Sequence, residues 1–361
     1  MKNTNIIILL VLLQVSMPAF SQEVLWKAGV HSFFDNNEFT GCSVKESQTM
    51  AGTHLVPQIG LNFNEKHRIF AGIDAMHEFG SDQTVAYYDP IAYYEYDGKP
   101  FRFYVGAFPR KTVLDRYPLM FFQDSINNYR PVMNGFFWEF YNKEDYINIW
   151  LDWTSRQTYT HRESFFMGWS AKYNWGVLYG QHFGYMFHFA GSANLDISEP
   201  VQDNCAILYS LGVDFSKKTG FEKLEANAGW ALGMEKDRGT DDGFQPRQGF
   251  LSEIKVEYKG LGLFNTFYKG SGQQMSYNRF GNALYWGDPI YRAKQHDKLD
   301  GYIRFIKNNT VDVKFVYSLY FAENNIFHQQ ALYATFDLDN LKKKAQRPYE
   351  YIWSNWLSAM R

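Results

Sequence analysis

The segment Val311–Phe321, VDVKFVYSLYF, alternates between apolar and mostly polar side chains. Its odd positions are all Val, Phe, Tyr or Leu, whereas its even positions include Asp312, Lys314 and Ser318. A period of two residues predicts a β-strand with one apolar face and one largely polar face. In a soluble sandwich the apolar face packs on a core, but in a transmembrane barrel it faces lipid and the polar face lines the lumen. The rest of the chain decides between these two environments.

The same alternation recurs along the whole chain and predicts about sixteen strands, with fourteen as the alternative count. The predicted strands are 24–34, 49–63, 67–79, 85–96, 100–109, 132–141, 145–154, 162–172, 175–189, 204–216, 222–233, 248–258, 261–269, 297–306, 311–321 and 327–337.

Short and long connections alternate between these strands. Turns such as 64–66 (NEK) and 97–99 (DGK) are short, whereas connections such as 110–131 and 270–296 are long. Up-and-down outer-membrane barrels have short periplasmic turns and long outer loops, and a Greek-key sandwich has no reason for this sorting. We therefore predict an all-β fold, a transmembrane antiparallel up-and-down β-barrel, in which the apolar face of 311–321 meets lipid.

The chain begins like an exported protein. Lys2 precedes an apolar run at 6–13 that is too short to span a bilayer, and small residues then favour cleavage before Gln22. The predicted organisation is therefore a signal peptide at 1–21, a barrel at 22–338 and a periplasmic tail at 339–361.

Composition limits the remaining classes. Aromatic residues make up 19% of the chain, the formal net charge is −2, and only Cys42 and Cys205 are present. A net charge so close to zero does not indicate nucleic-acid binding, and a chain with only two cysteines is not a disulfide scaffold. Abundant aromatics suit interfacial girdles of a barrel. They also suit a secreted carbohydrate-binding β-sandwich, which stays as a second alternative.

Strand count, connection lengths and the exported start resemble those of porin-like outer-membrane barrels of double-membrane bacteria. The resemblance is architectural and covers the mature chain to about residue 338. It implies an outer-membrane channel for passive or weakly selective diffusion of small hydrophilic solutes. The implied partners are outer-membrane lipid and those solutes, and a homo-oligomer is a further expectation.

In general porins the third long loop folds into the barrel and narrows the pore. Here the third long connection, 110–131, follows the fifth strand and contains the apolar run PLMFF, which needs a surface to pack on. We expect the loop to fold inward and to give the channel a mild anion preference. The expected constriction residues are Arg110, Lys111, Asp115, Arg116, Asp124 and Arg130. Further lumen charges are expected at Arg68, Asp74, Arg102, Lys255, Arg304, Asp312 and Lys314, because charge on the lipid face is costly.

Catalytic motifs are absent from the sequence: it has no GxSxG elbow, HExxH helix or Walker glycine loop. We therefore predict no enzyme, no cofactor and no metal site. The alternative is a closed barrel that acts as an enzyme or a surface-binding protein. Candidate bases for that alternative are His161, His182 and His188, with Ser155, Ser164 or Ser170 near them in sequence, and His182 and His188 share one strand parity.

Overall fold

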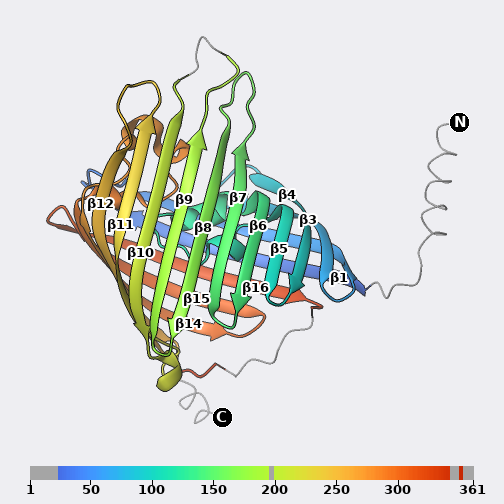
Figure 1. The fold of residues 1–361 in the computed structure, drawn as a ribbon. Helices are drawn as coiled ribbons and strands as arrows, with labels where there is room; N and C mark the ends of the chain where they lie inside the picture. Colours follow the sequence, from blue (N-terminus) through green and yellow to red (C-terminus); the bar gives the residue numbers. More distant parts are fainter. Residues whose placement is uncertain (1–22, 195–198, 342–348, 353–361) are drawn as a thin grey trace, which may run out of the picture.

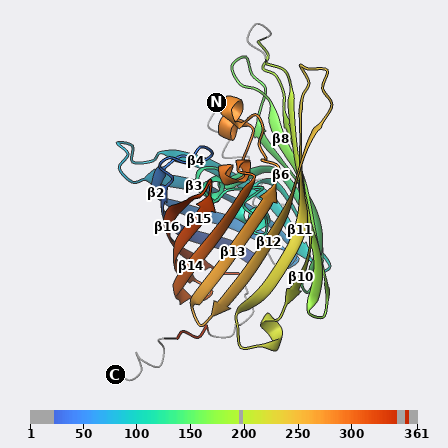
Figure 2. The ribbon, with the colours of Figure 1, turned by 90° about the vertical axis from the view of Figure 1, so that its left-hand side faces the viewer.

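The computed structural model describes residues 23–194, 199–341 and 349–352. Sixteen strands form one closed antiparallel barrel in which each strand pairs with its sequence neighbours and β1 pairs with β16 (Figures 1 and 2). This confirms the predicted fold class and the count of sixteen. The predicted signal peptide and most of the predicted tail lie outside the described residues.

Most predicted strand boundaries agree with the structure to within three residues. The strands are β1 (Glu23–Glu38), β2 (Gln48–Phe63), β3 (His67–Glu78), β4 (Tyr87–Gly98), β5 (Phe101–Pro109), β6 (Val132–Asn142), β7 (Asp145–Ser155), β8 (Ser164–Trp175), β9 (Leu178–Phe189), β10 (Gln202–Asp214), β11 (Lys223–Asp237), β12 (Gln245–Tyr258), β13 (Leu261–Gly270), β14 (Gln295–Lys307), β15 (Val311–Ala322) and β16 (Asn325–Asp339).

Side chains on β15 divide as the alternation predicts. Tyr317 and Phe321 are exposed on the outside of the barrel, whereas Val316, Ser318 and Tyr320 are buried on the lumen side. Exposed large apolar side chains recur on the other strands with the same period. The outer wall is therefore the apolar surface that a bilayer solvates.

The two-residue turn Lys259–Gly260 illustrates the short-turn end of the barrel. Both residues have positive φ, 49° and 89°, as a tight β-hairpin turn requires. The opposite end carries the long connections. Among the described residues, no helix is long and apolar enough to cross a membrane.

Two long loops lie at and within the outer end of the barrel, and Figure 2 shows orange helical segments of the second loop at its mouth. The first, 110–131, contains α2 (Lys111–Leu114) and α3 (Asp124–Tyr129). The second, 271–294, contains α4 (Tyr277–Phe280), η2 (Gly281–Ala283) and η3 (Pro289–Arg292). Together we call these two loops the plug.

The two plug loops are joined by backbone hydrogen bonds. The Gln123 N–H donates to the Trp286 carbonyl (2.8 Å), and the Asp288 N–H donates to the Leu119 carbonyl (2.8 Å). Between these bonds a Cβ at Gly287 would lie 2.1 Å from the Met120 carbonyl oxygen. Glycine is therefore required at this position for the loops to approach so closely.

The plug packs its apolar side chains on the lumen wall. Trp286 is 2% exposed, and its ring lies 4.7 Å from that of Phe166 on β8 and 6.4 Å from that of Phe122 in the first loop. Burying a large apolar side chain contributes about 1.5–3 kcal/mol. The apolar run PLMFF, for which the sequence indicated no packing surface, is thus buried by contacts within the same chain.

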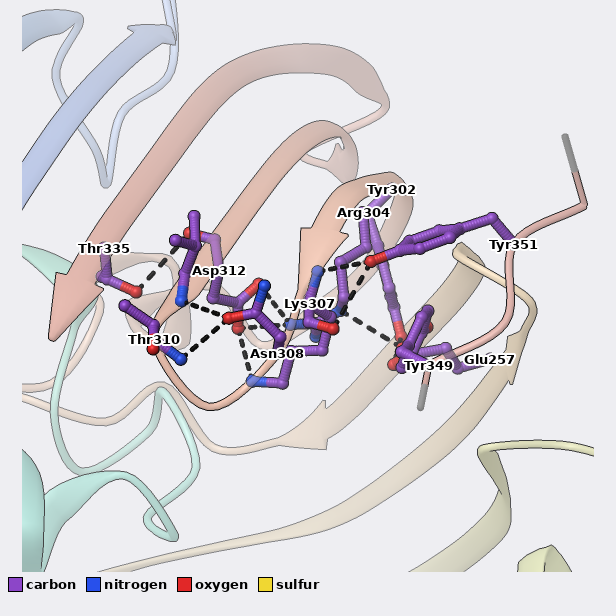
Figure 3. Close-up of polar contacts among 11 residues, drawn as sticks. Glu257, Tyr302, Arg304, Lys307, Asn308, Thr310, Asp312, Thr335, Tyr349 and Tyr351 are labelled. Atoms are coloured by element: carbon purple, nitrogen blue, oxygen red, sulfur yellow. Dashed lines mark hydrogen bonds and ion pairs between the residues drawn. The ribbon is translucent and has the colours of Figure 1, made fainter. Parts of the chain in front are cut away.

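Below the plug the lumen contains a polar cavity of about 1070 Å³ that reaches the short-turn end. Figure 3 shows part of its wall, where Arg304 lies between Glu257 (3.2 Å) and Asp312. The segment 349–352 is docked at the same end, because the Tyr351 hydroxyl accepts a hydrogen bond from the Lys307 N–H (2.6 Å).

Candidate active site

The six expected constriction residues all belong to the first plug loop, and they divide into two groups by what their side chains contact. Lys111, Asp115, Arg116 and Asp124 line the cavity. Arg110 and Arg130 instead lie against the second plug loop, each with its guanidinium 4.9 Å from the centre of the Trp286 ring. Arg110 is also buried in an ion pair with Asp152.

All seven expected lumen charges lie on lumen-facing strand positions, and opposite charges or rings surround them. Arg68 pairs with Glu95 (2.7 Å), and Arg102 lies 3.9 Å from Glu139. Lys255 contacts Glu253 (3.4 Å). The remaining pairs are Asp74 with His54, Arg304 with Asp312, and Lys314 above the rings of Tyr302 and Tyr333.

The first strand is longer than the predicted 24–34. It continues as β1 to Glu38, so Asp35 and Asn37 are buried inside the barrel. Asp35 accepts hydrogen bonds from Asn37 (3.0 Å) and Gln329 (2.7 Å). Cys42 and Cys205 are both free thiols.

Histidine meets a carboxylate at three places in the described part of the chain. The pairs are His31–Asp337, His54–Asp74 and His188–Asp203. The first two line the lumen cavity. The third lies on the outside of the barrel, because odd positions of β9 and even positions of β10 form the lumen wall.

The outer pair has the geometry of a base and its orienting acid. His188 Nδ1 lies 3.0 Å from Asp203 Oδ1. A carboxylate only accepts hydrogen bonds, so Nδ1 carries the proton and Nε2 keeps a free lone pair. Arg238 holds the same carboxylate from the other side, with Nε 2.6 Å from Oδ2 and Nη2 3.1 Å from Oδ1. Asp203 is therefore fixed from two directions.

The depth of this pair matches the outer boundary of the membrane. His188 follows Leu178, the first residue of β9 at the short-turn end, by ten positions (188 − 178). At about 3.3 Å per residue and a tilt of about 45°, this is a rise of roughly 23 Å, close to the ~25 Å apolar band of such barrels. The imidazole thus lies near the level where outer-leaflet acyl chains join their head groups.

Aromatic and basic side chains flank the pair in one row across the wall. The register places Trp153, Phe165, His188, Asp203 and Lys236 on consecutive strands from β7 to β11. The Phe165 ring lies 5.1 Å from both the Trp153 ring and the His188 ring. This row offers an apolar surface on one side of the base and two cations, Lys236 and Arg238, on the other.

The serines suggested by the sequence do not reach this histidine. Ser164 and Ser170 face the lumen side, where they contact Thr154 and Asn148. Ser155 donates to the Arg162 carbonyl (2.7 Å). His161 contacts the neighbouring Thr158 and Thr160 in its own loop. Asp203 and Arg238 were missed in the sequence, although strand parity and the β9–β10 hairpin could have placed Asp203 opposite His188.

Comparison with protein families gives one match along most of the chain. A family model described as lipid A 3'-O-deacylase-type matches residues 17–344. No curated protein matches the chain.

Solved structures share the fold at very low identity. The loop L8 deletion mutant of OmpT, an outer membrane protein of Vibrio cholerae, has 8% identity and a TM-score of 0.51, covering 88% of this chain and 100% of that one. OccK11 (OpdR) of Pseudomonas aeruginosa has 9% identity and a TM-score of 0.51, covering 88% of this chain and 96% of that one. Together with the family match, these comparisons confirm an outer-membrane β-barrel of a Gram-negative bacterium.

The family match corrects two predictions. The main prediction of a channel for hydrophilic solutes is wrong, and so is the prediction that the protein is not an enzyme, because the family is one of hydrolases that act on lipid A. The alternative of a closed barrel enzyme is the better description. Sequence motifs failed here because a base on a barrel wall needs a cross-strand partner and leaves no local signature.

Proposed function

The chain belongs to the lipid A 3'-O-deacylase-type family, and on this premise we propose that it hydrolyses an ester-linked acyl chain of lipid A at the outward-facing His188–Asp203 pair. The 3'-O chain is the substrate position that the family description names. The observation that carries the proposal is the position of the pair, on the lipid-facing wall and at the level of the outer head groups.

Water is the nucleophile in this proposal. His188 Nε2 removes a proton from a water molecule, and the water oxygen attacks the ester carbonyl carbon. The bond between that carbon and the sugar oxygen then breaks, and the proton on Nε2 passes to the leaving alkoxide. The products are a free fatty acid and a sugar hydroxyl, so atoms and charge balance.

Asp203 acts through the histidine. Its carboxylate keeps the proton on Nδ1 and stabilises the imidazolium that forms when Nε2 takes a second proton. Arg238 keeps the carboxylate in place through its two contacts. The position of Asp203 therefore decides the tautomer and the orientation of the base.

The neighbouring cations suit the head group of the substrate. Lipid A is a phosphorylated glycolipid, and Arg and Lys bind phosphate through charge-assisted hydrogen bonds. Lys236 follows Asp203 in the cross-strand row, and Arg238 is half-exposed beside it. Phosphate bound here would hold the ester close to the histidine while Trp153 and Phe165 contact the acyl chains.

The test is to incubate the purified, folded barrel with lipid A in detergent and to follow the products by mass spectrometry. We expect release of one acyl chain by the wild-type protein and its loss in the variant His188→Gln. His182→Gln is the matched control, because His182 lies on the same outward face of β9 but lower on the wall. Equal product from wild type and His188→Gln would reject this site.

A further inference from the structure

A second feature of the outer wall is an apolar groove at the opposite end of the same strands. It has a volume of about 810 Å³ and lies across β6 to β11. Small residues such as Ala171, Gly180 and Ala228 line it between larger side chains. Trp175 and Leu211 stand out from the wall there, at 56% and 71% exposure. The hydrolytic pair at His188 does not contribute to it.

The groove opens toward the periplasmic end of the barrel. Its lining includes Asn142 and Asp145, which flank the short turn between β6 and β7, and Trp175, the last residue of β8. Short turns lie on the periplasmic side of outer-membrane barrels. The groove therefore faces the periplasmic leaflet and not the leaflet that contains lipid A.

His182 lines the outward face of this groove. Two other ionisable residues in the lining, Asp145 and Lys172, have partners within the chain, the Asn174 amide and the Tyr179 ring. The only ring contact of His182 in the described chain is with Tyr209 (5.6 Å), and no hydrogen bond joins it to another described residue. An ionisable group on a membrane-facing surface is costly unless something binds it. His182 therefore needs a polar partner from outside the protein, while the surface around it needs an apolar one.

The periplasmic rim next to the groove carries three lysines, beside the carboxylates of Glu144 and Asp145. Lys143 lies in the β6–β7 turn, and Lys217 and Lys218 belong to η1 (Ser216–Lys218). Lys217 also forms an ion pair with Glu144, which brings η1 to the β6–β7 turn. Exposed lysines at a membrane surface attract the phosphate of lipid head groups.

We propose that this groove binds a glycerophospholipid of the periplasmic leaflet. An acyl chain lies over the small residues, the His182 N–H donates to an ester carbonyl, and the phosphate lies toward the rim lysines. The three requirements, an apolar chain, a hydrogen-bond acceptor just below the surface and an anion at the surface, meet in this class of molecule. The proposal is independent of lipid A hydrolysis, because it concerns the other leaflet.

Native mass spectrometry of the folded barrel in detergent tests this proposal, with phosphatidylethanolamine or phosphatidylglycerol added as the probe. We expect one phospholipid to stay bound to the wild-type protein. His182→Leu removes the hydrogen bond and should weaken retention by up to about tenfold. The double variant Ala171→Phe/Ala228→Phe fills the groove and should abolish retention.

The control is Ala51→Phe/Ala92→Phe, which adds the same side chains at outward positions of β2 and β4 far from the groove. Heat-dependent gel mobility shows whether each variant is folded. Equal phospholipid retention by the groove and control variants would overturn the proposal, and so would a dimer of the chain whose formation depends on the groove. Lipid A hydrolysis measured on the same samples separates this result from the proposed function.

Discussion

Two histidine–aspartate pairs in this barrel have the same chemistry and opposite surroundings. His54 and Asp74 lie inside, with Nδ1 and Oδ1 2.6 Å apart and both residues at most 6% exposed. His188 and Asp203 lie outside, 3.0 Å apart, with Arg238 on the same carboxylate. Distances alone would therefore mark both pairs as catalytic, and the His31–Asp337 pair (2.7 Å) as well.

The difference between the pairs lies in what can reach them. The His54 ring is 6.0 Å from Phe33, which in turn packs on Tyr129 of the plug. An amphiphile held in the outer leaflet has no path to this position through the wall, whereas His188 lies on the outward face of β9 that meets the leaflet. In a membrane barrel, the face of the strand on which a base lies therefore decides whether lipid or the lumen surrounds it, and so which substrate can reach it.

The largest expected effect comes from replacing the two histidines, His188 and His54, one at a time. His188→Gln should reduce lipid A hydrolysis by about 10²–10⁴-fold, the usual contribution of a general base. His54→Gln should leave the rate at the wild-type value. Rates measured with purified variants by mass spectrometry check this, and a loss confined to His54→Gln would move the active site into the lumen.

Replacing the two aspartates, Asp203 and Asp74, should distinguish the outer pair from the inner pair in the same way, with a smaller effect on kcat. Asp203→Asn weakens the control of the His188 tautomer and should lower kcat by about 10–100-fold, the range found for carboxylates that orient metal-bound histidines. Its pH profile should change as well, because the imidazolium loses its counter-charge. Asp74→Asn should change neither kcat nor the profile.

Removing the plug anchor should affect only the inner pair. Trp286→Ala deletes a buried side chain that contacts Phe166 and Phe122, and should cost about 3–5 kcal/mol of plug stability. His54 should then become accessible to a histidine-modifying reagent, whereas the reactivity of His188 stays constant. Peptide mapping after modification measures both, and unchanged protection of His54 would mean that the plug does not shield it.

Acid should loosen the plug through Asp288. Burial opposes ionisation of this carboxyl, but Lys45 (2.8 Å) and the Ile290 N–H (2.9 Å) bind the carboxylate and hold its pKa below the usual value. Its stabilising effect is thus complete above the ordinary aspartate pKa of about 3.9 and is lost as pH falls through the lowered value.

The variant Asp288→Asn should therefore lose about 1.5–3 kcal/mol of plug stability at neutral pH, the contribution of a charged hydrogen bond. The stability of the plug in this variant should also depend less on pH in the acid range. Protection of His54 against modification, measured over a pH series, gives both results. A wild-type plug as acid-sensitive as the variant would exclude Asp288 as the anchor.

Strand positions were predictable because each strand carries its own two-residue period. Val311 to Phe321 needed no distant information, and its lipid-facing side followed from the lengths of the connections. The extension of β1 through Asp35 was missed because FDNNEF has the composition of a turn, and only pairing with β2 and β16 explains its strand conformation.

The proposed active site was predictable only in part. His188 was recognisable as a candidate base, but its partners come from β10 and from the residue after β11, and no local motif joins them. The loop 110–131 suggested a channel because a long connection with an apolar run is expected both for a loop that narrows a pore and for a loop that plugs it. What separates them is the second loop, whose Trp286 packs between Phe166 of the wall and Phe122 of the first loop.

The backbone bonds between Gln123 and Trp286 and between Asp288 and Leu119 have a consequence for the whole cell. An unobstructed barrel of this width would be a leak, and each added copy would weaken the permeability barrier of the outer membrane. The two loops that are joined inside this barrel obstruct such a leak. We therefore expect that a bacterium can make this protein abundantly and remodel its surface lipid without becoming more sensitive to harmful solutes.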